Sequence, residues 1–295
     1  MYILCCPCIT SPDLRAVGIT DDQDHEAFKK ARDRFSRFGI TVRYLPCPET
    51  LFLGKDRQPA TFSERLDTPE FPPLLDRLEA EVRELIATYG PPVAIVGVDA
   101  SPCCGVNLNW KSPENRAIGR GAFLDRFPDI PAYDVFEASR FKVYLAAPLF
   151  SEAERTWNLK VAESLTSLAF DVYLPQETGD TSADRDSRAL GDIFMDNLRA
   201  LNAADVVVAV IDGADPDSGT AWEMGYAYGK GKTVITIRTD FRRVGDAEMV
   251  NLMLEEGVDG SCSSLDQLPH LLPFPIAIRS GSSSPCNKED KCRDP

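Results

Sequence analysis

Six consecutive apolar residues, at positions 206–211, constrain the fold more than any other part of the sequence. Runs of this kind are far shorter than the ~20 apolar residues that span a bilayer, so no membrane segment is expected. Strands that are apolar on both faces are typical of parallel sheets covered by helices on both sides. We therefore expect residues 205–211 to form the central strand of a doubly wound α/β domain.

The second half of the chain alternates strands with helices around this run. From residue 151 onward, Trp157, Val161 and Leu165 recur at helical spacing, with charged residues on the rest of the surface. A ligand site of such a sheet lies beyond the carboxyl ends of its strands. Strands are expected at 142–147, 170–174, 205–211 and 233–237, and helices at 151–168, 190–201, after residue 219 and at 246–255.

The first half shows the same alternation and predicts another parallel α/β sheet. Strands are expected at 2–6, 40–45 and 93–98, and helices at 24–38 and 72–89. Glycines and prolines interrupt the pattern between residues 116 and 138, which places a domain boundary near residue 139. The 295 residues thus predict two doubly wound domains, 1–139 and 140–279, and a disordered tail at 280–295.

The net charge of −14 limits the partners that the chain can bind. An acidic protein repels a phosphate backbone, so we expect no nucleic-acid binding. The N-terminus lacks a positively charged leader with a long apolar core, so we expect a cytoplasmic protein whose nine cysteines form no disulfides. Six of the nine lie in the first 104 residues, which indicates metal or redox chemistry in the first domain.

Four carboxylates follow the buried run, at the place where a ligand site is expected. They are Asp212, Asp215, Asp217 and Glu223. Structural explanations are open for all of them. The three aspartates can belong to a turn, and Glu223 can complete a capping box in which Thr220 begins a helix.

The sequence around these carboxylates resembles the nucleoside 2-deoxyribosyltransferase family. The resemblance rests on the segments at 143–150, 204–213 and 217–227, which occur in the family's order and spacing, and it covers residues 141–279. It implies a flavodoxin-like, Rossmann-like sheet without a cofactor. It also implies exchange of the base of a 2'-deoxynucleoside through a covalent deoxyribosyl-enzyme.

The same resemblance assigns roles to three residues of this site. Glu223 matches the nucleophile, Asp217 the acid that helps to handle the base, and Tyr144 an aromatic hydroxyl beside the nucleophile. The chemistry requires these residue types. A carboxylate can stabilise an oxocarbenium-like state and trap it as an ester, and a protonated carboxyl helps the leaving nitrogen to depart.

Further positions are expected to contact the substrate. Gln176, in a Pro-Gln pair, could hydrogen-bond the edge of a base, and Phe150 and Gly219 belong to the matching segments. The chain departs from the family at Asn197, where many members carry an aspartate, with Asp196 beside it. Asparagine can hydrogen-bond a base but cannot donate a proton as an acid, which affects base preference.

Three cysteine-containing segments in the first domain each follow a predicted strand. They lie at residues 3–8, 46–49 and 101–105. Loops at the carboxyl edge of one parallel sheet can converge although they are far apart in sequence. Cysteines can also simply fill a core, but that explains one or two of them rather than three groups flanked by proline or glycine.

These segments resemble the thiouracil desulfurase family over residues 2–125. The match makes Cys8, Cys47 and Cys104 the ligands of a [4Fe-4S] cluster with one open iron, which can bind the sulfur of a thiolated base. Glu49 and Ser101 would activate or orient the water that replaces the sulfur. Cys5, Cys6 and Cys103 are additional cysteines in the same loops, which could substitute as cluster ligands or bind zinc instead. A structural zinc site on Cys5, Cys8, Cys47 and Cys104 is the main alternative.

The sequence thus predicts a bifunctional enzyme that acts on deoxynucleosides and on free nucleobases, thiolated nucleobases included. Two alternatives stay open for the second domain. One is a nucleoside N-glycosidase, which transfers the sugar to water. The other is a non-catalytic nucleotide-binding module in which Glu223 only caps its helix. A homo-oligomer is expected, because members of the family often complete the site with residues of a neighbouring subunit.

Overall fold

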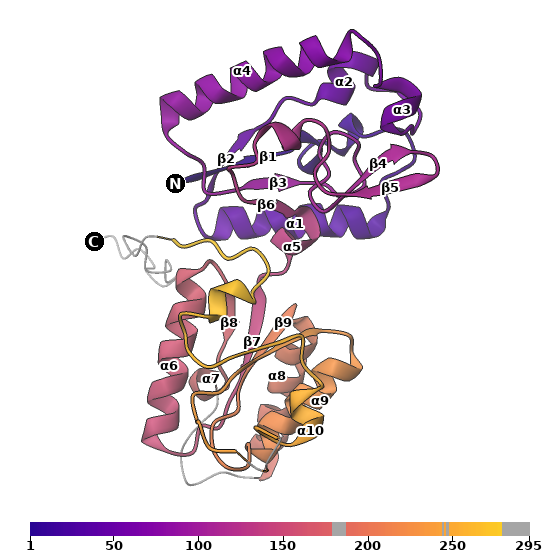
Figure 1. The fold of residues 1–295 in the computed structure, drawn as a ribbon. Coiled ribbons are helices and arrows are strands. Elements are labelled where there is room, and N and C mark those ends of the chain that lie inside the picture. The colour runs from indigo at the N-terminus through magenta and orange to yellow at the C-terminus, as the bar shows by residue number, and fades with distance from the viewer. Residues whose placement is uncertain (179–186, 244, 246–247, 279–295) are drawn as a thin grey trace, which may run out of the picture.

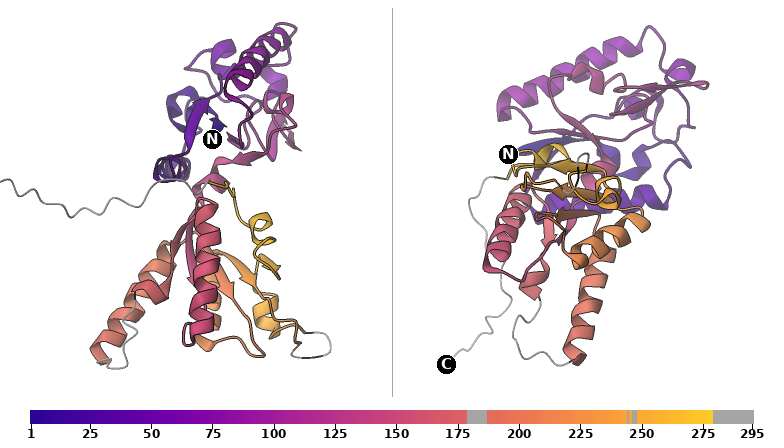
Figure 2. Two further views of the ribbon diagram at one scale, coloured as in Figure 1. Left: turned by 90° about the vertical axis from the view of Figure 1, so that its left-hand side faces the viewer. Right: turned by 60° about the horizontal axis from the view of Figure 1, so that its bottom comes forward.

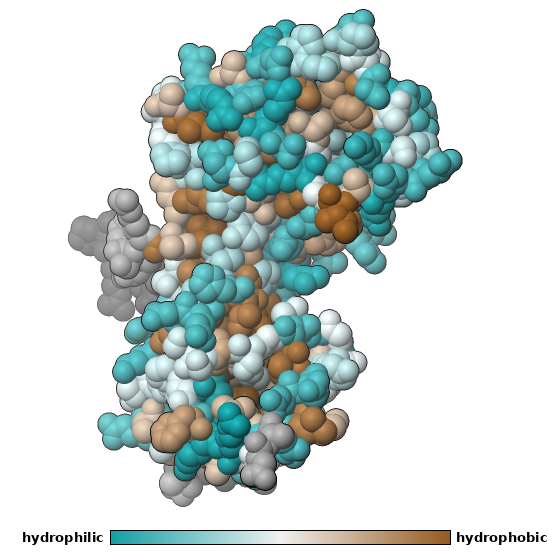
Figure 3. All heavy atoms as spheres, viewed as in Figure 1, coloured by the Kyte–Doolittle hydropathy of each residue, from teal (hydrophilic) through white to brown (hydrophobic). Residues whose placement is uncertain are grey.

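The computed structural model describes residues 1–178, 187–243, 245 and 248–278, so the expected tail at 280–295 lies outside the described residues. The chain forms two lobes, each built on its own parallel sheet (Figure 1). This confirms the predicted α/β class. Figure 3 shows a mainly hydrophilic surface with scattered apolar groups, as the acidic composition suggests. No helix of the described residues is long and apolar enough to cross a membrane.

The first lobe contains a four-stranded sheet in the order β2-β1-β3-β6, with every pair parallel. Helices α1 and α5 cover one face and α4 covers the other (Figure 1). The strands are β1 (Tyr2–Cys5), β2 (Thr41–Tyr44), β3 (Ile95–Gly97) and β6 (Ala132–Asp134), and the helices are α1 (Asp22–Arg37), α4 (Phe71–Tyr89) and α5 (Val135–Ser139).

Short elements follow the carboxyl ends of these strands and build one edge of the first lobe. An antiparallel hairpin that the sequence did not predict lies at residues 108–118, so only its last three residues fall in the irregular region at 116–138. The elements are η1 (Pro7–Ile9), η2 (Pro12–Leu14), α2 (Pro48–Leu53), α3 (Phe62–Arg65), β4 (Leu108–Ser112), β5 (Asn115–Ile118) and η3 (Leu124–Arg126).

The second lobe contains a five-stranded parallel sheet in the order β11-β10-β9-β7-β8, the flavodoxin order. Helix α6 packs on one face, and α8 and α9 pack on the other (Figure 2). The strands are β7 (Lys142–Ala146), β8 (Asp171–Tyr173), β9 (Val206–Val210), β10 (Thr233–Ile237) and β11 (Gly260–Cys262). The helices are α6 (Glu152–Ser167), α7 (Pro175–Thr178), α8 (Ser187–Ala203), α9 (Ser218–Gly229), α10 (Leu252–Glu255) and η4 (Leu268–His270).

One expected helix is wrong in its extent. The sequence predicts a helix at 246–255, whereas α10 begins at Leu252 and residues 246–247 lie outside the described part. The physical reason is a cap. The side chain of Asn251 accepts a hydrogen bond from the amide of Met253 at 3.0 Å, which starts the helix there.

The two lobes are joined through a buried arginine of α1. Arg34 is fully buried and donates to the carbonyl oxygens of Ala169 at 3.1 Å, Ala138 at 3.3 Å and Phe274 at 2.8 Å. Burial lowers the pKa of Arg34 to about 9, so the side chain stays charged at neutral pH. Phe274 and the residues after it pack into the core of the first lobe, although they follow the second sheet in sequence.

Replacing Arg34 with methionine should destabilise the protein by about 3 kcal/mol or more, because three buried carbonyl groups lose their donor. Urea unfolding measures the change. The control is Arg37→Met, which removes an ion pair to Asp171 from a side chain that is 57% exposed and should cost no more than about 1 kcal/mol. Equal effects of the two substitutions would contradict the role given to Arg34.

Candidate functional site

The second lobe has a cavity at the point where the strand order reverses, between β7 and β9. Doubly wound sheets bind ligands at this point, beyond the carboxyl ends of the strands. The volume of the cavity is about 310 Å³, within the range of sites for small molecules. The lining residues are Tyr144 of β7, Phe194, Asn197, Leu198 and Leu201 of α8, and Gly219, Trp222 and Glu223 of α9.

Helix α9 places Glu223 in this cavity and does not use it as a cap. Asp217 is the N-cap residue, and its Oδ2 accepts a hydrogen bond from the amide of Thr220 at 2.9 Å. The alternative of a capping box between Thr220 and Glu223 is therefore wrong, because the helix begins earlier than that pattern requires. The Oε1 atom of Glu223 instead accepts a hydrogen bond from the hydroxyl of Tyr144.

The surroundings of Glu223 favour its neutral form. Burial raises its pKa, the hydrogen bond from Tyr144 lowers it and the charge of Asp217 raises it, and the result of the three effects is a pKa of about 7. Tyr144 is fully buried, and burial together with the charge of Glu223 raises the pKa of this phenol. Tyr144 therefore stays a hydrogen-bond donor, and Glu223 can switch between acid and carboxylate near neutral pH.

Aromatic rings support one side of the cavity and flank its opening. Tyr144 stacks on Tyr173, with ring centroids 5.5 Å apart, and the hydroxyl of Tyr173 donates to Oδ1 of Asn197 at 3.0 Å. Phe194 and Trp222 line the cavity and remain 51% and 49% exposed. A planar ligand would thus meet aromatic surface and an oriented amide. The sequence did not single out Tyr173, Phe194 or Trp222.

Three of the other predicted substrate contacts, Gln176, Phe150 and Asp196, lie outside the lining of this cavity. Gln176 is held to α6, since its Nε2 donates to the carbonyl oxygen of Arg155 at 3.0 Å. Phe150 is 75% exposed. Asp196 forms an ion pair with Arg199 on the surface of α8. Gly219 does line the cavity.

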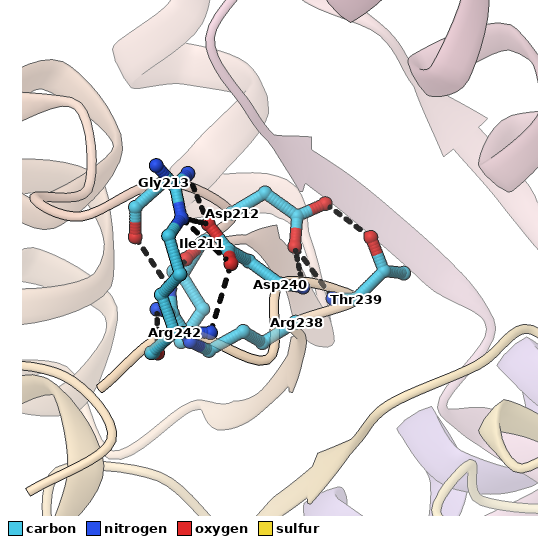
Figure 4. A network of polar contacts seen from close by, with 7 residues as sticks. All are labelled: Ile211, Asp212, Gly213, Arg238, Thr239, Asp240 and Arg242. Carbon is cyan, nitrogen blue, oxygen red and sulfur yellow. Dashed lines mark hydrogen bonds and ion pairs between the residues drawn. The ribbon is translucent and has the colours of Figure 1, made fainter.

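A polar network fixes the loop between β9 and α9 (Figure 4). Asp212 accepts hydrogen bonds from the amide of Thr239 at 2.5 Å and from its hydroxyl at 2.9 Å. Buried Arg238 donates to the carbonyl oxygens of Ile211 at 2.6 Å and Gly213 at 2.8 Å. Asp212 is therefore structural, as the turn interpretation expects. Arg238, which the sequence did not reveal, anchors the segment that leads to Asp217 and Glu223.

The first lobe has a larger cavity, of about 460 Å³, in the size range of small-molecule sites. It also lies at the carboxyl ends of β1 and β3, where the strand order of the first sheet reverses. All five residues predicted for this domain, Cys8, Cys47, Glu49, Ser101 and Cys104, line it. The lining also includes Cys6, one of the additional cysteines, and Arg15, Arg57 and Trp110, which the sequence did not assign to the site.

Glu49 and Ser101 form a hydrogen-bonded pair in this cavity. The hydroxyl of Ser101 donates to Oε1 of Glu49 at 2.9 Å, and Nη2 of Arg57 donates to Oε2 at 3.3 Å. The amide of Cys104 donates to Oγ of Ser101 at 3.0 Å. The hydroxyl of Ser101 and the carboxylate of Glu49 are therefore in direct contact, and Ser101 also contacts the backbone of Cys104, a predicted cluster ligand.

The cysteines around the cavity are free thiols. A hydrogen bond between Cys104 and Cys6, together with burial, raises the pKa of Cys104, and burial beside the thiols of Cys104 and Cys47 raises that of Cys8. Within the described ranges, no group of three or more His, Cys, Asp or Glu side chains is arranged so that it could hold a metal ion as it stands. The thiols share a cavity wall, and iron would have to displace their protons to bind.

The structure does not bring together the four cysteines of the alternative zinc site. Cys5 lines a separate hollow with Phe35 of α1, whereas Cys8, Cys47 and Cys104 line the large cavity. The separation follows from the strand, because successive side chains of β1 point to opposite faces of the sheet. Cys6, the next residue, lies on the wall of the large cavity.

Comparison with known proteins identifies the second lobe. Residues 143–263 match the family model described as nucleoside 2-deoxyribosyltransferase. This range extends from β7 to β11 and includes both Tyr144 and Glu223. The match thus covers the sheet of the second lobe. No curated protein matches the chain.

Solved structures also resemble part of the chain. A conserved protein from Enterococcus faecalis V583 is 31% identical with a TM-score of 0.38, and the match covers 43% of this chain and 94% of that one. A 2-deoxyribosyltransferase from Bacillus psychrosaccharolyticus is 25% identical with a TM-score of 0.39, covering 46% and 98%. A 2-desoxiribosyltransferase from Leishmania mexicana is 25% identical with a TM-score of 0.35, covering 43% and 92%. Each match covers less than half of this chain.

Proposed function

Because residues 143–263 form a domain of the nucleoside 2-deoxyribosyltransferase family, we propose that the chain exchanges the base of a 2'-deoxynucleoside, with Glu223 as the covalent nucleophile. The observation that carries the proposal is the position of Glu223. Its carboxyl group lies in the wall of a cavity at the reversal point of the sheet and is oriented by a buried tyrosine. A capping role does not account for this position, because Asp217 caps the helix.

The proposed reaction has two steps that balance. In the first, a carboxylate oxygen of Glu223 bonds to the anomeric carbon while the bond from that carbon to the base nitrogen breaks, and the base takes a proton from Asp217. In the second, a nitrogen of another base attacks the same carbon, the ester breaks, and Asp217 takes up the proton of the incoming base. The cap at Asp217 uses Oδ2 for both of its hydrogen bonds, so it does not occupy Oδ1.

Tyr144→Phe should move the pH dependence of transfer to higher pH. The hydrogen bond from Tyr144 lowers the pKa of Glu223, so its removal should raise that pKa above the present value of about 7. The nucleophile must be ionised, so the acidic limb of the kcat/KM profile should shift to higher pH. The activity that the variant loses relative to wild type should be smaller at alkaline pH. Steady-state rates across the pH range measure this shift. An unchanged limb would mean that Tyr144 does not act on Glu223.

Asp217→Asn separates a structural role from a chemical one. Asparagine caps helices about as well as aspartate, so the start of α9 should be kept. If Asp217 transfers the proton, deoxyribosyl transfer should fall by about 10²–10⁴-fold. Loss of its charge should also lower the pKa of Glu223, which moves the acidic limb to lower pH. If Asp217→Asn transferred deoxyribose at the wild-type rate, Asp217 would cap the helix and have no part in proton transfer.

A transferase and an N-glycosidase differ in what accepts the sugar. With a deoxynucleoside alone, both release free base. Addition of a second base should convert the product to a new nucleoside if the chain is a transferase, whereas a glycosidase should continue to produce free deoxyribose. We propose transfer, because the cavity offers aromatic surface and Asn197 for an incoming base.

We also propose that a second copy of the chain covers the opening of this cavity. Two apolar side chains that line the cavity, Phe194 of α8 and Trp222 of α9, remain about half exposed there. Apolar groups gathered at the opening of a site are typical of a surface that another molecule covers. Light scattering of the purified protein tests this, and a monomer would contradict it.

For the first domain we propose a second function, removal of sulfur from a thiolated base. The supporting observation is that Cys8, Cys47 and Cys104 line one cavity with the hydrogen-bonded pair of Glu49 and Ser101. A [4Fe-4S] cluster, when bound by these thiolates, would offer an open iron to the sulfur of the substrate. Ser101 and Glu49 would then orient the water that supplies oxygen to the product and receive its proton.

The two proposed activities fit a sequence in which a thiolated deoxynucleoside first loses its sugar and the free base then loses its sulfur. Lys30 of α1 pairs with Asp205 just before β9, so the lobes meet at the amino ends of the second sheet. Glu223 lies beyond the carboxyl ends, away from this contact. We therefore expect the base to diffuse between the sites rather than pass through a channel.

The order of the steps has a direct test. Supplied with 2-thio-deoxyuridine under anaerobic conditions, the wild type should release sulfide, and Glu223→Gln should release it only from free 2-thiouracil. Equal release from the nucleoside and the free base by Glu223→Gln would show that the domains act independently.

A further inference from the structure

Arg57 is a buried cation in the wall of the first-lobe cavity, and the sequence motifs give it no role. It follows α2 and is only 7% exposed. Its Nη1 donates to the hydroxyl of Thr50 and to the carbonyl oxygen of Gly54, both at 3.2 Å. Its Nη2 donates to Glu49 at 3.3 Å. A long side chain loses considerable conformational entropy when it is held this way, so the site fixes Arg57 by several bonds at once.

The two carboxylate oxygens of Glu49 have different partners. Oε2 accepts from Arg57, and Oε1 accepts from the hydroxyl of Ser101 at 2.9 Å. A carboxylate held at one oxygen by a guanidinium group cannot rotate freely about its last bond. The ion pair therefore sets the direction in which the other oxygen points, and that direction is toward Ser101.

We infer that Arg57 is the positioning residue of the first-lobe site, which fixes Glu49 against Ser101 so that this pair can orient water and accept a proton. The inference rests on the proposed desulfurase function. Arg57 acts through Glu49 and is not itself a group that reacts. Loss of such a support displaces a catalytic group by a small distance, and errors of about 1 Å can cost about 10²-fold in rate.

Another use of Arg57 has to be distinguished from this one. Its Nε atom is buried and has no hydrogen-bond partner among the described residues. If that donor bonded the ligand instead, its loss would weaken ligand binding and leave the chemical step unchanged. Separate measurements of binding and turnover can therefore decide between positioning and ligand contact.

The experiment compares wild type, Arg57→Ala and Arg57→Lys in the full chain, purified anaerobically. Lys55→Ala is the control. Lys55 lies two positions before Arg57 in the chain, and the substitution removes only a surface ion pair with Asp13. Iron content and deoxyribosyl transfer by the second domain report whether each variant is folded and loaded. Binding of uracil to the iron-free protein is measured by calorimetry, and sulfide release from 2-thiouracil gives kcat.

For Arg57→Ala we expect kcat to fall by about 10²-fold, with an unchanged affinity for uracil and partial recovery on addition of guanidinium ion. Arg57→Lys should retain more activity, and Lys55→Ala should match wild type. A crystal structure of Arg57→Ala should show Glu49 released from Ser101.

Full kcat in Arg57→Ala, or weaker uracil binding with kcat unchanged, would overturn the positioning role. Wild type that contains iron but releases no sulfide from 2-thiouracil would instead refute the proposed desulfurase function, and the inference with it.

Discussion

Glu223→Gln is expected to abolish deoxyribosyl transfer, with a loss of more than about 10⁴-fold. The amide has nearly the same size, and its oxygen can accept the hydrogen bond that Tyr144 donates to Glu223. An amide cannot form the ester intermediate, so the substitution removes the nucleophile and leaves the shape of the cavity in place. Rates of base exchange measured with saturating acceptor test this. Transfer at the wild-type rate would refute the assignment.

The same variant should be more stable than wild type above neutral pH. The folded-state pKa of Glu223, about 7, lies above the ordinary value of 4.5 for a glutamate side chain, so the unfolded chain loses its proton first as the pH rises. Between these two values the free energy of unfolding of wild type falls, by at most about 3 kcal/mol, and Glu223→Gln avoids this loss. In thermal melts, the Tm of Glu223→Gln should exceed that of wild type at alkaline pH and equal it under acidic conditions. A lower Tm at every pH would indicate damage to the fold.

Each of three single substitutions should remove iron and acid-labile sulfide from the anaerobically purified protein: Cys8→Ser, Cys47→Ser and Cys104→Ser. A cluster held by three thiolates needs every one of them. Wild type should be brown. Cys5→Ser is the matched control within the same domain, since Cys5 lines a different hollow. Cys262→Ala is the control in the second lobe, on β11.

Two results would contradict this prediction. Colourless protein with about one zinc per chain would show a structural metal site instead of a cluster. Retention of iron after Cys47→Ser would show that another thiol, such as Cys6 on the same wall, is the ligand.

The sequence predicted the parts of the fold that depend on local patterns. The apolar run that became β9 and the helical spacing in α6 were sufficient to predict a second doubly wound sheet, whereas the order of its strands comes from the structure. The segment that contains Glu223 follows a predicted strand, as do the three cysteine segments, and this was sufficient to predict that each set would lie at one edge of its sheet. The structure places each set in a single cavity.

Features that depend on contacts between distant segments could not be predicted. Arg34 and Arg238 bind carbonyl groups, which any residue provides, so no side-chain pattern marks their partners. The sequence suggested Thr220 as the cap of α9, whereas Asp217 caps it, because both are good cap residues and spacing alone does not show which one begins the helix. Gln176 was expected to face a base, but its amide is held by the backbone of α6, a contact that sequence spacing cannot show.

The central claim is that Glu223 carries the sugar between two bases. The most direct measurement is mass spectrometry of protein quenched in acid during turnover with a deoxynucleoside. We predict a peptide that contains Glu223 and has gained the mass of one 2-deoxyribosyl group. The adduct should disappear on addition of an acceptor base and be absent from Glu223→Gln. Base exchange without any adduct, or an adduct on a different residue, would contradict the account.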